Sequence, residues 1–254
     1  MRPESDLELA ERAARRAGAL LLERFGGPAS GLEQKSSSTD MVSDADRDAE
    51  TAIVDMLRAE RPDDGLLGEE DASREGLSGR RWVIDPLDGT TNYLYRFPAW
   101  VVSVAVEDSE GGLAGAVFDP VRDELFAAAR GEGLVVNGER TSVREPVATE
   151  RALVATGFSY ESARRADQAA VVSRVLPRVR DIRRAGAAAF DLALLAAGRL
   201  DGYYERGLKP WDWAAGRLLV TEAGGTVVEL EDEPAGLVAA STPELAEALV
   251  GLVG

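Results

Sequence analysis

The first 60 residues show the apolar spacing of two surface helices. Residues 5–25 carry apolar side chains along one face, with Glu and Arg between them: Leu7, Ala10, Ala14, Ala17 and Leu21. Gly26-Gly27-Pro28 should end this helix, and the polar, serine-rich residues 30–42 are typical of a loop. Ser43 can cap a second helix that runs to about residue 60.

Short apolar runs of strand length fill the middle of the chain. We predict strands at 82–84, 101–107, 113–118 and 124–128, and we expect antiparallel pairing between them. Asn137-Gly138 is a strong signal for a two-residue hairpin turn.

Strands and helices alternate more regularly after residue 150. The predicted strands are 152–156, 181–183, 202–204, 226–230 and 237–239. The predicted helices are 162–176, 188–198, 212–222 and a last one from Pro243. The whole pattern predicts a mixed α+β fold in two tightly packed parts, residues 1–145 and 146–254, with their boundary near 140–150.

Two absences from the composition narrow the chemistry. The chain has no cysteine and no histidine, which excludes disulfides, thiolate or imidazole metal sites, cysteine nucleophiles and serine–histidine triads. The net charge of −16 disfavours nucleic acid and anionic membranes as partners, and a phosphorylated substrate would need bound cations. Because we see neither an apolar run of about 18 residues nor a signal-peptide pattern, we expect a cytoplasmic protein.

The segment Asp85-Pro86-Leu87-Asp88-Gly89-Thr90 is the strongest candidate for chemistry. It follows a predicted buried strand and precedes a helical turn, so its two aspartates can converge on one point. Pro86 fixes the local backbone, and the Leu87 carbonyl can act as a neutral ligand. Oxygen-only ligands suit Mg²⁺ or Mn²⁺. Gly89 allows close approach to the backbone, and the amides of Gly89 and Thr90 can receive a phosphate. Taken alone, the segment is more simply explained as a capped turn with two solvated aspartates.

Three dispersed motifs resemble signatures of the inositol monophosphatase family. They are Trp82-Val-Ile-Asp85-Pro-Leu-Asp88-Gly-Thr90-Thr-Asn-Tyr93, Trp211-Asp212-Trp-Ala-Ala-Gly216 followed by Glu222-Ala-Gly-Gly225, and Gly68-Glu69-Glu70 upstream. The resemblance spans Lys35 to Gly225. It implies a layered αβαβα fold, a homodimer, inhibition by Li⁺, and Mg²⁺-dependent hydrolysis of a small phosphorylated polyol, myo-inositol monophosphate.

The resemblance also implies roles for individual residues. Glu69, Asp85 and the Leu87 carbonyl would hold one Mg²⁺, while Asp85, Asp88 and Asp212 would hold a second. A third, weaker ion would lie near Glu69, with Glu70 as a further candidate ligand. The Thr90 hydroxyl and Asp46 would orient the attacking water, and Lys35 would lie on a loop over the metals.

The alcohol part of the substrate would meet the second half of the chain. Gly186-Ala187-Ala188 matches a family segment whose backbone contacts the inositol ring, although relatives often carry Ser or Thr at the position of Ala187. Glu205, seven residues before Asp212, matches an acidic contact to ring hydroxyls. Asp88, Gly89, Thr90 and Asp212 would also touch the substrate.

Two alternatives stay open at this point. Related enzymes cleave fructose 1,6-bisphosphate or histidinol phosphate, although Thr90-Thr91-Asn92-Tyr93 resembles the inositol branch. Some bacterial relatives act with the transcription machinery, so a regulatory role is an alternative of a different class.

Overall fold

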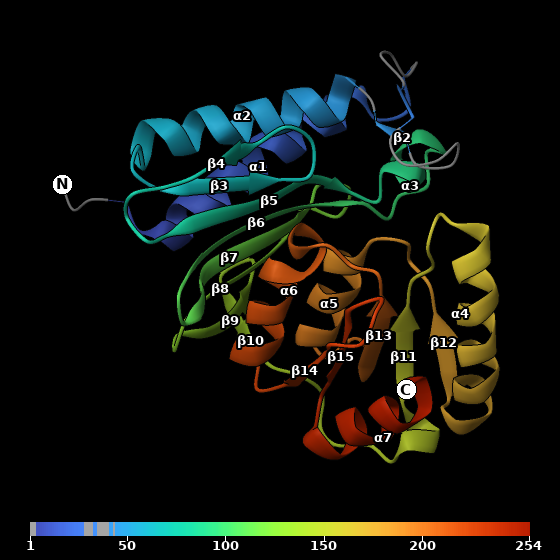
Figure 1. Cartoon of the computed structure of the whole chain (residues 1–254). Coiled ribbons are helices and arrows are strands. Elements are labelled where there is room, and N and C mark those ends of the chain that lie inside the picture. Colours follow the sequence, from blue (N-terminus) through green and yellow to red (C-terminus); the bar gives the residue numbers. More distant parts are fainter. Residues whose placement is uncertain (1–3, 28–32, 35–40, 43) are drawn as a thin grey trace.

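Five stacked layers make up the computed structural model, which describes residues 4–27, 33–34, 41–42 and 44–254 (Figure 1). The first layer holds helices α1 (Asp6–Arg24) and α2 (Asp44–Glu60), side by side. Helix α1 begins at a capping box, because the Ser5 hydroxyl accepts the Glu8 N–H (3.2 Å) and the Glu8 carboxylate accepts the Ser5 N–H (2.8 Å). Its predicted apolar face is buried from Ala10 to Leu21.

The second layer is an eight-stranded sheet in the order β10-β9-β8-β7-β6-β5-β3-β4. Its strands are β3 (Gly65–Gly68), β4 (Ser73–Arg74), β5 (Arg81–Asp88), β6 (Val101–Asp108), β7 (Gly111–Asp119), β8 (Glu124–Ala129), β9 (Gly133–Val136) and β10 (Glu139–Thr141). The predicted antiparallel pairing holds from β5 through β8, while β3, which was not predicted, pairs parallel with β5. The predicted turn at Asn137-Gly138 joins β9 to β10, with positive φ at both residues.

The third layer consists of α5 (Ala188–Ala196) and α6 (Pro210–Glu222), which lie between the two sheets (Figure 1). Helix α5 is buried on nearly every side, as expected for a helix that is apolar all round. The two helices approach closely at Gly216, where a Cβ atom would lie 2.6 Å from the Leu192 side chain.

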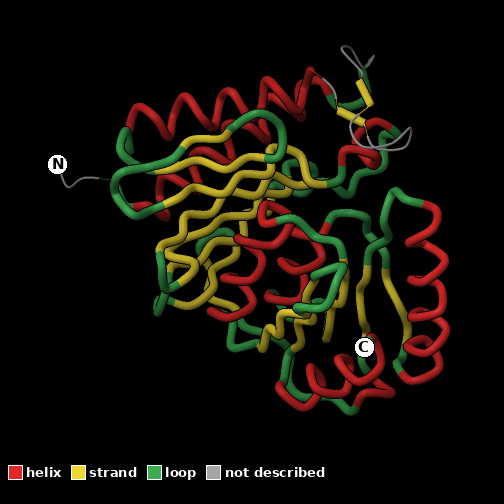
Figure 2. The backbone as a smooth tube through the Cα atoms, in the orientation of Figure 1, coloured by secondary structure: helices red, strands yellow, loops and turns green. Residues whose placement is uncertain are grey.

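A five-stranded sheet forms the fourth layer, and two helices cover its outer face as the fifth (Figure 2). The sheet order is β12-β11-β13-β15-β14. Its strands are β11 (Leu153–Thr156), β12 (Asp181–Arg183), β13 (Gly202–Arg206), β14 (Thr226–Leu230) and β15 (Gly236–Ala240). The outer helices are α4 (Ser162–Val175) and α7 (Pro243–Val253). This order of layers confirms the predicted αβαβα fold.

Local departures from the prediction are few. Residues 30–42 contain two short paired strands, β1 (Glu33–Gln34) and β2 (Met41–Val42), within the segment predicted as a loop. The predicted Ser43 cap and Lys35 lie outside the described residues. The proposed division near residue 145 stays a prediction, since α6 contacts strands of both sheets.

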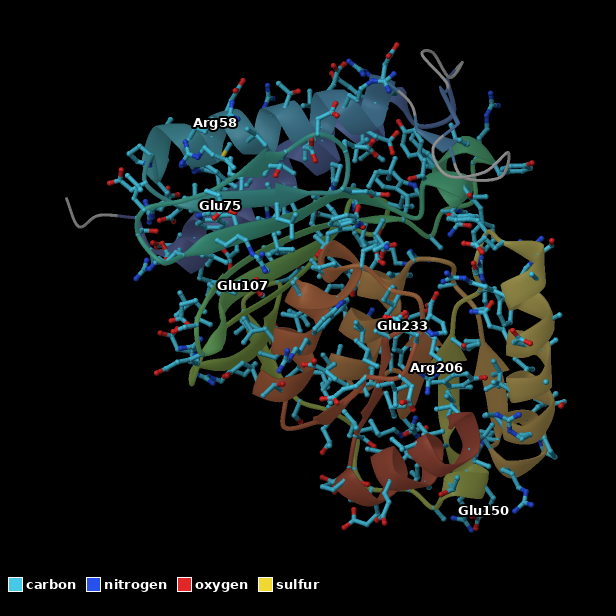
Figure 3. The ribbon with its side chains drawn as sticks, in the orientation of Figure 1. Arg58, Glu75, Glu107, Glu150, Arg206 and Glu233 are labelled. Atoms are coloured by element: carbon cyan, nitrogen blue, oxygen red, sulfur yellow. The ribbon has the colours of Figure 1, made fainter. Side chains whose placement is uncertain are left out.

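Charged side chains such as Arg58, Glu75 and Glu150 lie at the surface (Figure 3). Arg206, also labelled in Figure 3, donates to the carbonyls of Asp232 (3.0 Å) and Pro234 (3.2 Å) and so ties β13 to the turn before β15. Within the described ranges, every helix is too short or too polar to cross a membrane.

Candidate active site

The end of strand β5 carries the first signature in an irregular backbone. Its register against β6 shifts between Asp85 and Asp88, so a bulge re-aims the side chains there. The Asp85 carboxylate accepts the Leu87 N–H at 3.0 Å. Upstream, the buried Trp82 donates from its indole N–H to Asp64 at 2.8 Å, which anchors the strand. The strand predicted to end at Asp85 therefore continues through Asp88.

Gly89 and Thr90 make the transition from β5 to the short helix α3 (Thr90–Leu94). Gly89 has a φ of 96°, and a Cβ atom there would lie 2.9 Å from the Ala99 carbonyl oxygen. Only glycine therefore fits without strain. The buried Thr90 hydroxyl lies 3.2 Å from Asp46 Oδ1 and 3.1 Å from the Leu87 carbonyl oxygen. The predicted pairing of Thr90 with Asp46 is therefore present in the geometry.

Glu69, Asp85, Asp88 and Asp212 form an acidic cluster where the end of β5 meets the start of α6. Burial raises the pKa of Asp85 well above its ordinary value, and the charges of Glu69, Asp88 and Asp212 raise it further. Burial is also the main cause that raises the pKa of Asp88 to about 7 and the pKa of Asp212 well above its ordinary value. Four acidic groups from distant parts of the chain therefore lie within electrostatic range of each other.

The chemistry of these groups fits divalent cations. Carboxylates, together with the Leu87 carbonyl, provide hard oxygen ligands of the kind that Mg²⁺ and Mn²⁺ bind. In the part of the chain that the structure describes, no three acidic side chains already stand in the geometry of a metal complex. The carboxylates of the cluster therefore repel one another in the structure, and a bound cation would relieve that repulsion.

The second half of the chain is tied directly to this cluster. Asp88 Oδ2 accepts the Ala189 N–H at 2.7 Å, at the start of α5. Asp212 lies in the first turn of α6 and accepts the Lys209 N–H at 2.6 Å. The helix starts two residues earlier than predicted, with Pro210 in its first position. Asp88 and Asp212 therefore connect the acidic cluster to α5 and α6, the two helices between the sheets.

The predicted alcohol contacts lie beside the same helices. Gly186 has a φ of 90°, and Ala187 and Ala188 are buried at the start of α5. The Glu205 carboxylate accepts a hydrogen bond from the Tyr203 hydroxyl at 2.6 Å. Burial raises the pKa of Glu205 to about 7. The charge of Glu205 raises the pKa values of Asp88 and Asp212, so Glu205 lies near the acidic cluster.

Two further residues, for which no role was predicted, hold the segment before α5. Asn92 donates to the carbonyls of Ala99 (2.6 Å) and Ala185 (2.8 Å), and the buried Asp191 accepts the Ala185 N–H. Asn92 is part of the first signature, and Asp191 is an acid within an apolar helix. Both features could have indicated a polar role inside the protein.

The remaining candidates have different outcomes. The Glu70 N–H donates to Glu50 at 3.1 Å, and the Glu70 side chain is half-buried. Lys35 lies outside the described residues, so its predicted place over the metals stays a prediction. The metal, catalytic and substrate roles of the other candidates also stay predictions, although the structure brings these residues close together.

A layered fold with an acidic cluster beside a Thr–Asp pair is an arrangement suited to metal-assisted hydrolysis of phosphate esters. The chain matches the inositol monophosphatase family over residues 2–253, and it belongs to that family. It is 42% identical over 223 residues to the Nus factor SuhB of Escherichia coli strain K12, covering 87% of this chain and 84% of that protein.

Solved structures show the same architecture. The extragenic suppressor protein SuhB from Bartonella henselae superposes with a TM-score of 0.88 and 36% identity, over 96% of both chains. Inositol monophosphatase from Anabaena superposes with a TM-score of 0.84 and 33% identity, over 96% of this chain and 95% of that one.

Proposed function

We propose that this protein is a Mg²⁺-dependent phosphatase that hydrolyses myo-inositol monophosphate to inositol and phosphate. The observation that carries the proposal is the convergence of Glu69, Asp85, Asp88 and Asp212 beside the Thr90–Asp46 pair. An acidic chain with a net charge of −16 needs such a cation site to receive a phosphate.

The cluster would hold two cations, and a third, weaker one would lie near Glu69. Glu69, Asp85 and the Leu87 carbonyl would hold the first, and Asp85, Asp88 and Asp212 the second. When bound, the cations supply charge neutralisation for the phosphate oxygens and lower the pKa of the attacking water. Mn²⁺ could replace Mg²⁺ at such oxygen sites, and Li⁺ would inhibit turnover.

The Thr90–Asp46 pair would orient the attacking water. The Thr90 hydroxyl lies within hydrogen-bond distance of Asp46 Oδ1 and of the Leu87 carbonyl oxygen. With the Leu87 carbonyl on a cation, the hydroxyl would donate its proton to Asp46, and its lone pairs could accept from a donor on the other side. A water molecule can then donate one hydrogen to Thr90 Oγ1, which turns its own lone pair toward phosphorus.

Glu205 and the start of α5 would hold the alcohol. An ionised Glu205 can accept hydrogen bonds from two neighbouring hydroxyls of a polyol ring. Ala187 offers no hydroxyl, so this segment can contribute only main-chain groups, whose position Asn92 and Asp191 stabilise.

A substrate panel tests the proposal. Purified protein is assayed with inositol 1-phosphate, fructose 1,6-bisphosphate and histidinol phosphate, each with Mg²⁺ and with EDTA. We expect Mg²⁺-dependent release of phosphate, fastest from inositol 1-phosphate. Faster turnover of either of the other two substrates would replace the proposed substrate, and turnover unaffected by EDTA would refute the metal site.

A second candidate function is a role with the transcription machinery. The relatives named Nus factor SuhB support it, since they are 38–42% identical to this chain. The strong negative charge favours a protein partner over nucleic acid. Gel filtration with purified bacterial RNA polymerase tests this candidate: co-elution is expected if it is right, and separate elution at micromolar concentrations would refute it. The same column run without polymerase tests the proposed homodimer.

A further inference from the structure

The metal-ligand candidate Glu69 opens a short loop that is held by a single buried acid on helix α2. The Glu50 carboxylate accepts three successive main-chain N–H groups, from Glu70 (3.1 Å), Asp71 (2.8 Å) and Ala72 (3.0 Å). Its side chain is buried, with only 5% of the residue exposed. A carboxylate that accepts three N–H groups fixes the backbone that donates them.

The residues on both sides of Glu69 are also fixed. The Glu69 N–H donates to the Ile84 carbonyl of β5 at 3.1 Å, and the Gly68 N–H donates to the Ala72 carbonyl at 2.6 Å. A Cβ atom at position 68 would collide with Glu50 Oε1, so glycine is required for the carboxylate to come this close. The backbone of Glu69 is therefore held between β5 and Glu50.

Helix α2 places Glu50 on the same face as Asp46, because residues four apart lie one above the other on a helix. Asp46 contacts the Thr90 hydroxyl, and Glu50 contacts the loop that begins with Glu69. One face of one helix therefore contacts both the Thr–Asp pair and the loop that carries a metal-ligand candidate.

We propose that Glu50 is a positioning residue, which holds Glu69 where its carboxylate can join Asp85 around a cation. The proposal rests on the proposed function, because it assumes that this cluster binds metal. Glu50 would act only through the main chain of the loop. Replacing groups that orient metal ligands commonly weakens metal binding about 10- to 100-fold.

Metal binding without substrate provides the test. Mn²⁺ is titrated into the metal-free full-length protein by calorimetry, for wild type, Glu50→Gln and Asp119→Asn. In Glu50→Gln the amide keeps the shape, but its NH₂ group meets N–H donors instead of accepting them. We expect its Kd for Mn²⁺ to rise about 10- to 100-fold, and its phosphatase activity to recover at high Mg²⁺ with an unchanged KM for inositol 1-phosphate.

Asp119 is the matched control. It is also buried, and it accepts the N–H groups of Val121 (2.9 Å) and Arg122 (3.1 Å) in the turn after β7. Asp119→Asn should lose stability in thermal unfolding and bind Mn²⁺ with the wild-type Kd.

The outcomes separate the two proposals. If wild type binds no Mn²⁺, the proposed function fails and the role of Glu50 fails with it. If wild type binds Mn²⁺ and Glu50→Gln binds it equally well, only the role of Glu50 is overturned. If Glu50→Gln does not fold, Glu50→Asp decides: a folded variant with weakened binding supports positioning, and an unfolded or normally binding variant overturns it.

Discussion

Removal of one hydroxyl next to the proposed alcohol contact gives a sharp test of how the substrate is held. Tyr203→Phe deletes the hydroxyl that donates to Glu205 at 2.6 Å and leaves the fully buried ring in place. That hydrogen bond favours the ionised form of Glu205, so its loss raises the pKa of Glu205 above the present value of about 7. Protonated Glu205 cannot accept hydrogen bonds from two ring hydroxyls.

The size of the effect follows from the hydrogen bond and the pKa. A hydrogen bond to a charged group contributes about 1.5–3 kcal/mol, and 1.4 kcal/mol is a tenfold change in proton affinity. With a pKa of about 7, Glu205 is about half ionised at pH 7. A tenfold stronger proton affinity lowers that fraction to roughly one tenth, so we expect the KM for inositol 1-phosphate to rise about fivefold at pH 7.

The assay is a pH series of kcat and KM with saturating Mg²⁺. The KM of Tyr203→Phe should approach that of wild type as the pH rises past 9, since Glu205 is then ionised in both proteins. Tyr204→Phe is the control, because Tyr204 packs in the core on the opposite face of the small sheet. An unchanged KM at pH 7, or an increase that persists at every pH, would show that Glu205 does not hold the alcohol in its ionised form.

Three substitutions at the end of β5 test the rest of the site. Asp85→Asn should abolish turnover and keep the far-UV circular dichroism spectrum, and more than a few per cent of residual activity would contradict its role with metal. Thr90→Ala should lower kcat about 10²- to 10⁴-fold and leave the Kd for Mn²⁺ unchanged, whereas weakened Mn²⁺ binding would assign it to the metal site. Gly89→Ala should lower the Tm measured by calorimetry, since its left-handed backbone costs other residues about 1–2 kcal/mol and its Cβ would press on the Ala99 carbonyl. An unchanged Tm would refute that strain.

Local sequence patterns predict most helices and strands of this fold to within a few residues. The helix predicted at 5–25 is found at Asp6–Arg24, and the strand predicted at 101–107 at Val101–Asp108. These elements are long and strongly periodic, and caps such as Ser5 mark their ends. Strand β3 was not predicted, because its sequence, Gly-Leu-Leu-Gly, has only two apolar side chains between glycines, and glycines favour turns.

Some residues of the candidate site stand in recognisable sequence motifs, whereas others acquire their contacts only through the tertiary structure. Asp85, Asp88 and Asp212 stand in dispersed motifs, so their residue types are visible in the sequence. Glu50 is different, because it accepts main-chain N–H groups of a loop that is distant in the sequence. No local pattern specifies such partners, since a helical acid is exposed and solvated unless the fold brings donors to it.

Asp88 shows why the two halves of the chain form one site. Its Oδ2 accepts the Ala189 N–H at the start of α5, while the charge of Glu69 raises the pKa of Asp88, so one carboxylate contacts α5 and lies within electrostatic range of the acidic cluster. The segment 186–188 directly precedes that N–H, so a shift of Asp88 would also move the backbone that is proposed to meet the alcohol. Because α5 is buried between the two sheets, its start cannot move independently of both layers. On the proposed function, cation binding and alcohol recognition would be coupled through this carboxylate, and substitutions at Asp88 should weaken both together.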